Sequence, residues 1–152
     1  MINERRPWGQ IVFNFPIGKD WKFQQRVRYD ARFKEKVQNG EVMDGHYGFN
    51  HRIRYMINLR KTIDGKPFNQ HSTFLSVNNE VLVNFGKEIS GNHLDQYRAS
   101  LFLGKNYKNT TIQLGYMYRF SPQKTLNNYK HYHGLTLWIS QNYKFKKPKG
   151  SI

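Results

Sequence analysis

The sequence predicts an all-β protein, an antiparallel up-and-down transmembrane β-barrel with about seven or eight strands visible in these residues. Three observations lead to this prediction. Apolar and polar residues alternate along most of the chain, no segment keeps a helical period, and aromatic residues make up 16% of the chain. Alternation gives each strand one apolar and one polar face. In a membrane barrel the apolar face contacts lipid and aromatic rings gather at the two interfaces.

Length and composition agree with one domain, and we expect a single β-barrel domain over residues 1–152. The formal charge is +15 and the mean hydropathy is -0.83. Such polarity excludes a helical membrane protein but not a barrel, because barrel strands need only about 9 to 11 residues with every second one apolar. Cysteine is absent, which excludes a disulfide framework, a thiolate metal site and a Cys nucleophile.

The clearest strand is Trp21 to Phe33, where odd positions are apolar, with Gln25 as the exception, and even positions are charged or amide. The same pattern recurs along the chain and predicts strands at Trp8 to Phe15, Trp21 to Phe33, Gly48 to Arg60, Thr73 to Phe85, Gln96 to Tyr107, Thr111 to Phe120 and Tyr132 to Phe145. The faces are biased but not pure. Further exceptions are His51 and Asn79 on the lipid face, and Met56, Phe74, Leu82 and Trp138 on the inner face.

The connections between these strands alternate in length. Tight turns are expected at Pro16 to Asp20 and Lys108 to Asn109, an intermediate one with an Asp64-Gly65 turn signal at Lys61 to Ser72, and long loops at Lys34 to Tyr47, Lys87 to Asp95 and Ser121 to His131. Transmembrane barrels have short periplasmic turns and long extracellular loops. If the last strand ends at Phe145 in the periplasm, the long loops lie outside, and the basic run Lys144 to Lys149 is a solvated periplasmic tail.

The strand count has a consequence for the amino terminus. Counting back through the alternation places Met1 outside the cell, whereas bacterial barrels of this kind have an even number of strands and periplasmic ends. The segment Met1 to Trp8 also lacks the apolar core of a secretory signal. We therefore expect the chain to be the C-terminal part of a larger barrel. A signal and an odd number of strands are expected to be missing before Arg5.

An ordered set of short motifs carries a family resemblance. The set is Arg6-Pro7-Trp8-Gly9-Gln10, Gln25-Arg26-Val27-Arg28-Tyr29 with Arg32, His51-Arg52-Ile53-Arg54-Tyr55, Asn79-Glu80 with Asn84-Phe85-Gly86, Asp95-Gln96-Tyr97-Arg98 and Gly115-Tyr116-Met117. Together these motifs resemble a Bacteroidota family of uncharacterised outer-membrane β-barrels, a domain of unknown function. The resemblance spans nearly the whole chain and implies fold and location, with a signal peptide and further strands before Arg6. It implies no activity.

The strongest polar constellation is a set of arginines that share the inner faces of their strands. The candidate lumen or ligand-binding residues are Arg26, Arg28, Arg32, Arg52, Arg54, Arg60, Glu80, Arg98 and Arg119. An uncompensated buried charge costs several kcal/mol, so carboxylates are expected among them. Asp30 and Glu80 are the inner candidates, and Asp95 lies at the rim. The set predicts either a salt-bridged plug that fills the lumen or a site or pathway for an anion.

Other function classes have weaker support. His131 and His133 share one face of a strand, but no third metal ligand is evident, and we expect no metal or cofactor. A lipid-modifying enzyme would need a Ser and His pair, yet Ser140 and His133 lie on opposite faces, so no catalytic residue is assigned. A soluble basic nucleic-acid-binding sheet fits the charge, but such a protein would bury its apolar face in one compact core.

The favoured prediction is therefore an outer-membrane barrel of a Gram-negative cell with an Arg-rich interior and outer-membrane lipid around it. Its role is structural, or it binds or passes an anionic small molecule. Nucleic acid is not an expected partner.

Overall fold

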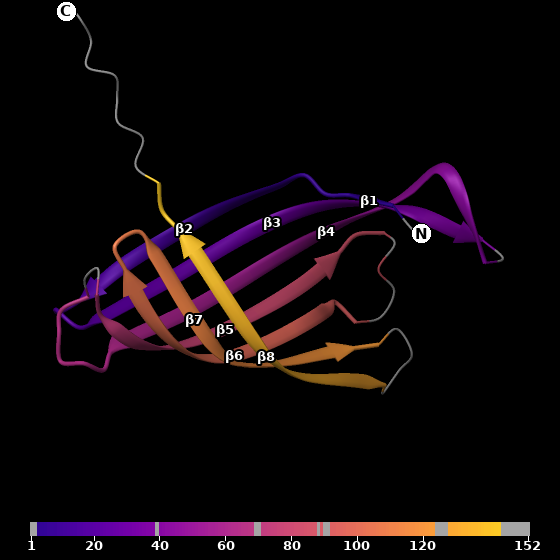
Figure 1. The fold of residues 1–152 in the computed structure, drawn as a ribbon. Coiled ribbons are helices and arrows are strands. Elements are labelled where there is room, and N and C mark those ends of the chain that lie inside the picture. Colours follow the sequence, from indigo (N-terminus) through magenta and orange to yellow (C-terminus); the bar gives the residue numbers. More distant parts are fainter. Residues whose placement is uncertain are drawn as a thin grey trace, which may run out of the picture.

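The fold is one antiparallel sheet of eight strands that curls into a half-barrel, as shown in a computed structural model (Figure 1). The structure describes residues 3–38, 40–68, 71–87, 89, 92–123 and 128–143. These residues contain no helix of the length and apolar character needed to cross a bilayer. The predicted all-β antiparallel fold class is confirmed.

The strands follow one another in a simple up-and-down order. They are β1 (Glu4–Arg5), β2 (Trp8–Ile17), β3 (Trp21–Gln38), β4 (Glu41–Thr62), β5 (Thr73–Phe85), β6 (Leu94–Tyr107), β7 (Thr110–Pro122) and β8 (Tyr129–Gln141). Each strand from β3 to β8 pairs with its chain neighbours, and β1 and β2 both pair with β3 on the side away from β4. Within the described residues the sheet does not close, so β2 and β8 are its two edges.

The sheet has its apolar face outward and its polar face inward, which reverses the usual arrangement of a soluble protein. Large apolar side chains cover the convex face, where Leu135 is 84% and Ile11 62% exposed. The concave face buries polar groups, including Asp30 and Ser76, both with no exposed area. The predicted alternation is therefore present in three dimensions, because the register keeps each set on one face.

Four apolar side chains are buried at different places on the concave face among these polar groups. They are Met56, Phe74, Leu82 and Phe102. The first three were expected exceptions to the alternation. Phe74 lies over Gly104 and Phe102 over Gly115, in each case where a Cβ atom would collide with the ring. Phe68, from the turn after β4, packs on Phe74 with a centroid separation of 5.2 Å. Aromatic rings thus lie on the concave side toward the end of the sheet that carries the β2–β3, β4–β5 and β6–β7 connections.

The long loop predicted at Lys34 to Tyr47 is wrong. β3 continues to Gln38 and β4 begins at Glu41, and Val37 pairs with Val42 across the hairpin. Asn-Gly is a strong hairpin turn sequence, and Gly40 adopts the positive φ of 85° that such a turn requires. The register shifts between Glu35 and Lys36, so the extension bends away from the sheet.

Several strand ends also differ from the prediction. The two-residue strand β1 was not expected, and β7 and β8 extend further into the connection that joins them. β5 has the predicted bounds, Thr73–Phe85. The last strand ends at Gln141, not Phe145. Phe145 and the basic run Lys144 to Lys149 lie outside the described residues.

Candidate functional site

All eight predicted arginines lie on the concave side of the sheet. We call this surface the arginine face, defined by Arg26, Arg28, Arg32, Arg52, Arg54, Arg60, Arg98 and Arg119 together with the carboxylates Glu4, Asp30, Glu80 and Asp95. The arginines come from four strands, β3, β4, β6 and β7, and the register explains why they share this surface. Arg28 is opposite Arg54, and Arg98 is opposite both Glu80 and Arg119. Residues directly opposite on adjacent strands share a face, so the arginines converge.

Asp30 is the most deeply buried carboxylate of the arginine face. Its Oδ1 accepts a hydrogen bond of 2.9 Å from Arg28 Nε, and its Oδ2 accepts one of 2.7 Å from Arg54 Nε. Its side chain has no exposed area. Two guanidinium partners supply the compensation that a buried carboxylate needs. The expected pairing of Asp30 with inner arginines is therefore present.

Glu80 forms a second set of ion pairs with two arginines on the same face. Arg26 Nη2 lies 2.6 Å from Glu80 Oε1, and Arg98 Nη1 lies 3.4 Å from Oε2. Arg98 also donates to Gln96 Oε1 at 2.7 Å. Because one carboxylate serves two arginines from β3 and β6, Glu80 joins the two halves of the sheet through β5.

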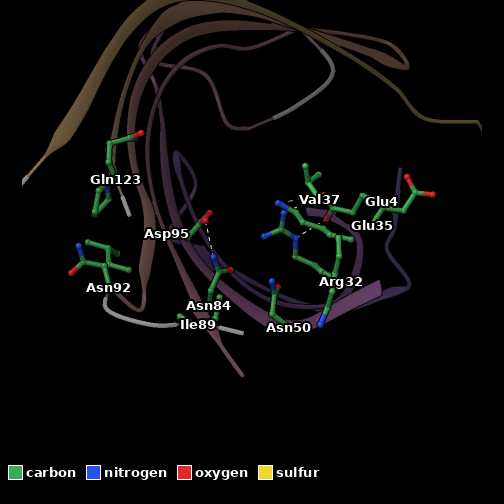
Figure 2. A pocket seen from close by; sticks show the side chains of 15 residues that line it. Glu4, Arg32, Glu35, Val37, Asn50, Asn84, Ile89, Asn92, Asp95 and Gln123 are labelled. Carbon is green, nitrogen blue, oxygen red and sulfur yellow. Dashed lines mark hydrogen bonds and ion pairs between the residues drawn. The ribbon is translucent and has the colours of Figure 1, made fainter. Parts of the chain in front are cut away.

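A third group of ion pairs lies at the end of the sheet that carries the β3–β4, β5–β6 and β7–β8 connections. Arg52 Nη2 contacts Asp95 Oδ2 at 2.8 Å, and Arg52 Nε also donates to Asn84 Oδ1. Asn84 in turn donates to Asp95 Oδ1 at 2.7 Å (Figure 2). Nearby, Arg32 donates to Glu4 through two hydrogen bonds of 2.6 and 3.1 Å. Glu4 was missed in the sequence because it belongs to β1, and no alternation marks a two-residue strand.

All of these residues except Arg52 line a cavity of about 910 Å³. The side chains that line it include those of Arg32, Asn50, Asn84 and Asp95, and Glu35 lies on the opposite side from Asp95 (Figure 2). Lys34 and Glu4 also line it, so its surface carries both signs of charge. The cavity lies at the opposite end of the concave side from Phe74 and Phe102. Because charged side chains line it, it can accept a polar ligand.

Two arginines of the face have no carboxylate partner within the described part of the chain. Arg60 donates to Asn58 Oδ1 at 2.7 Å. Arg119 lies 4.1 Å from the centroid of the Tyr132 ring, and its Nε is buried without a hydrogen-bond acceptor. The arginine face is thus only partly neutralised, because Arg60 and Arg119 lack a carboxylate among the described residues and Asp30 and Glu80 each serve two arginines.

The histidine and serine candidates do not form a site in the described residues. His131 and His133 lie on the convex face, where their Nδ1 atoms bond to the hydroxyl groups of Tyr118 and Tyr116. Ser140 lies on the concave face. The described residues contain no group of three or more His, Cys, Asp or Glu side chains that could hold a metal ion.

The fold and the arginine face define an all-β protein that curls into a partial barrel with an ionic interior and an apolar exterior. A family model described as a protein of unknown function (DUF2490) matches residues 1–130, so the chain belongs to this family. No curated protein and no solved structure matches the chain.

Proposed function

We propose that this protein is an outer-membrane β-barrel protein of a Gram-negative bacterium, from the Bacteroidota, whose arginine face binds an anionic small molecule. The observation that supports the membrane location is the exposed apolar convex face. It extends over β2 to β8, with Ile11, Val77, Leu101, Leu114 and Leu137 all more than 40% exposed. Apolar patches of this extent rarely face water. Lipid is the environment that leaves such a face stable.

Most of the arginine face serves as a framework. Arg26, Arg28, Arg54 and Arg98 share Glu80 and Asp30, and Arg52 pairs with Asp95. Paired buried charges hold strands in register, and removing one partner is costly. This agrees with the salt-bridged interior that the sequence suggested as one alternative.

The mixed-charge cavity supports ligand binding over free passage. It lies at the end with the β3–β4, β5–β6 and β7–β8 connections, whereas Phe74, Phe102 and Phe68 lie toward the opposite end. A concave face that is hollowed and polar at one end and carries rings at the other suits a ligand that enters and leaves from the polar end.

The other function classes have less support. A soluble nucleic-acid binder would bury its apolar face and expose its basic one, and this sheet does the reverse. A lipid-modifying enzyme would place Ser and His together at the lipid boundary, but Ser140 and His133 lie on opposite faces of β8.

Cell fractionation of the full-length natural gene product tests the membrane location. We expect the protein in the outer-membrane fraction, extracted by detergent but not by high salt or alkaline carbonate, because lipid and not charge would hold it. Unboiled samples should run at a different apparent mass from boiled ones on a denaturing gel, as a folded barrel resists detergent. Release by salt alone, or recovery as a monomer without detergent, would contradict the proposal.

A further inference from the structure

We infer that Arg119, together with Arg98 and Tyr132, forms a subsite for one small anionic group, a carboxylate or a phosphate. This inference rests on the proposed function in one respect, which is that the arginine face is the side that meets a ligand. It goes further by naming the place on that face and the chemistry that it recognises.

The register places the subsite in one row across the sheet. In this row Arg26 is opposite Met56, Met56 opposite Glu80, Glu80 opposite Arg98, Arg98 opposite Arg119, and Arg119 opposite Tyr132. The row holds three arginines and one carboxylate. Glu80 is already bound by Arg26 and Arg98, so no carboxylate of the row is left for Arg119.

Arg98 and Arg119 are like charges directly opposite each other on β6 and β7. Such pairs destabilise a sheet, and the one carboxylate beside this pair, Glu80, is shared between Arg98 and Arg26. The Nε of Arg119 is also buried without an acceptor. A desolvated donor without a partner costs about 1 to 3 kcal/mol, and more when it is charged. Both features would be relieved by one bound anion.

Tyr132 prepares Arg119 for this role. The guanidinium carbon lies 4.1 Å from the centroid of the ring, which is cation–π contact. This contact engages the π-face of the ring and uses none of the hydrogen-bond donors of Arg119, so its Nη groups are available to an anion. Two parallel bonds from a guanidinium match the two oxygens of a carboxylate or a phosphate.

Space for the anion is available beside these side chains. A cavity of about 260 Å³ is lined by Arg119, Tyr132, Met117 and Gly134 among others. A Cβ atom placed on Gly134 would meet nothing within 4 Å, so the neighbouring position on β8 is open. The volume suits a single small anionic group and not a large organic ligand.

Isothermal titration calorimetry of the full chain in a neutral detergent tests the subsite. The probes are inorganic phosphate, acetate and a short-chain phosphatidate, which separate free anions from a lipid headgroup. We expect wild-type protein to bind at least one probe, Arg119→Gln to weaken that binding at least tenfold, and Arg119→Lys to recover part of it. Tenfold corresponds to about 1.4 kcal/mol, which is close to the smallest loss expected when a hydrogen bond to a charged group is removed.

Lys105→Gln is the matched control, because it removes the same charge from an exposed side chain outside the arginine face, on the convex side of β6 with Leu101 and Leu103. Its affinity should stay within twofold of wild type. In anion-free buffer Arg119→Gln should unfold at about the same urea concentration as wild type, since the repulsion from Arg98 that it removes offsets the cation–π contact with Tyr132 that it loses.

The outcomes separate the two proposals. Equal binding by wild type and Arg119→Gln would overturn the subsite and leave ligand binding by the arginine face standing. Absence of binding by wild type to every probe would overturn both the subsite and the ligand role, while the membrane location is decided by the fractionation. Loss of affinity in Lys105→Gln as large as in Arg119→Gln would assign the effect to general charge and also overturn the subsite.

Discussion

At the scale of single residues, the concave side is organised by carboxylates that each serve more than one arginine. Asp30 and Glu80 are nearly inaccessible, and each accepts from two guanidinium groups. The sequence predicted both as inner partners because their strand parity matched that of the arginines. It could not predict the pairing of Arg32 with Glu4, because that contact depends on β1, whose position is set by the register and not by its own residues.

Glu80→Gln should lower the free energy of unfolding by about 3 kcal/mol, because it leaves two arginines without their counter-charge. This is the low end of the range for breaking a buried ion pair, since the side chains of Arg26 and Arg98 remain 25% and 28% exposed. Urea unfolding in lipid vesicles, followed by tryptophan fluorescence, measures the change.

Glu41→Gln at the exposed start of β4 is the control and should change the same free energy by less than about 0.5 kcal/mol, as surface substitutions do. Equal effects of the two substitutions would show that Glu80 does not hold the two arginines.

At the scale of elements, close packing between strands depends on two glycines opposite rings. At Gly104 a Cβ atom would lie 2.3 Å from Phe74 Cζ, and at Gly115 it would lie 2.1 Å from the Leu101 carbonyl oxygen. The alternation of apolar and polar residues does not predict these close contacts, because a small polar residue would fit the pattern at Gly104 and Gly115 as well as glycine does. The Asn-Gly turn before β4 is different, since its signal is local and readable.

Gly104→Ala should destabilise the protein by about 1 to 3 kcal/mol, the usual cost of overpacking, because the Phe74 ring must move. Adding Phe74→Leu to Gly104→Ala should recover part of the loss, since a shorter side chain leaves room for the methyl group. Urea unfolding of the single and double variants measures both changes.

Gly134→Ala is the matched control, as it places the same methyl group on β8 with nothing within 4 Å. It should be neutral. A double variant less stable than expected from the sum of its single substitutions would show that the Phe74 contact is not the cause.

At the scale of the whole molecule, the sequence predicted the fold well because one simple rule, period-two alternation, acts along every strand. The convex surface follows directly from it. The location of the cavity could not be predicted from the alternation. It depends on where β3 and β4 bend at their register shift, and on how the start of β6 and the end of β7 are placed around the cavity.

Val77→Arg tests which medium the convex face meets. Val77 is 44% exposed in the middle of β5, so in water an arginine there would change little, whereas in lipid it should cost about 2 to 4 kcal/mol at the bilayer midplane. Folding into lipid vesicles under a urea titration measures the difference.

Ile63→Arg is the control, because Ile63 is 55% exposed but lies beyond the end of β4. It should fold as wild type does. Equal and small effects at both positions would count against a lipid-facing convex surface.

The order of the strands also limits how the sheet can assemble. Every neighbouring pair is antiparallel, so β2 and β8, at the two edges, run in the same direction. Two copies inserted the same way into one bilayer would therefore meet edge to edge only as parallel strands. An antiparallel seam between them would require one copy to be upside down. A single strand lying between the edges, antiparallel to both, meets no such conflict.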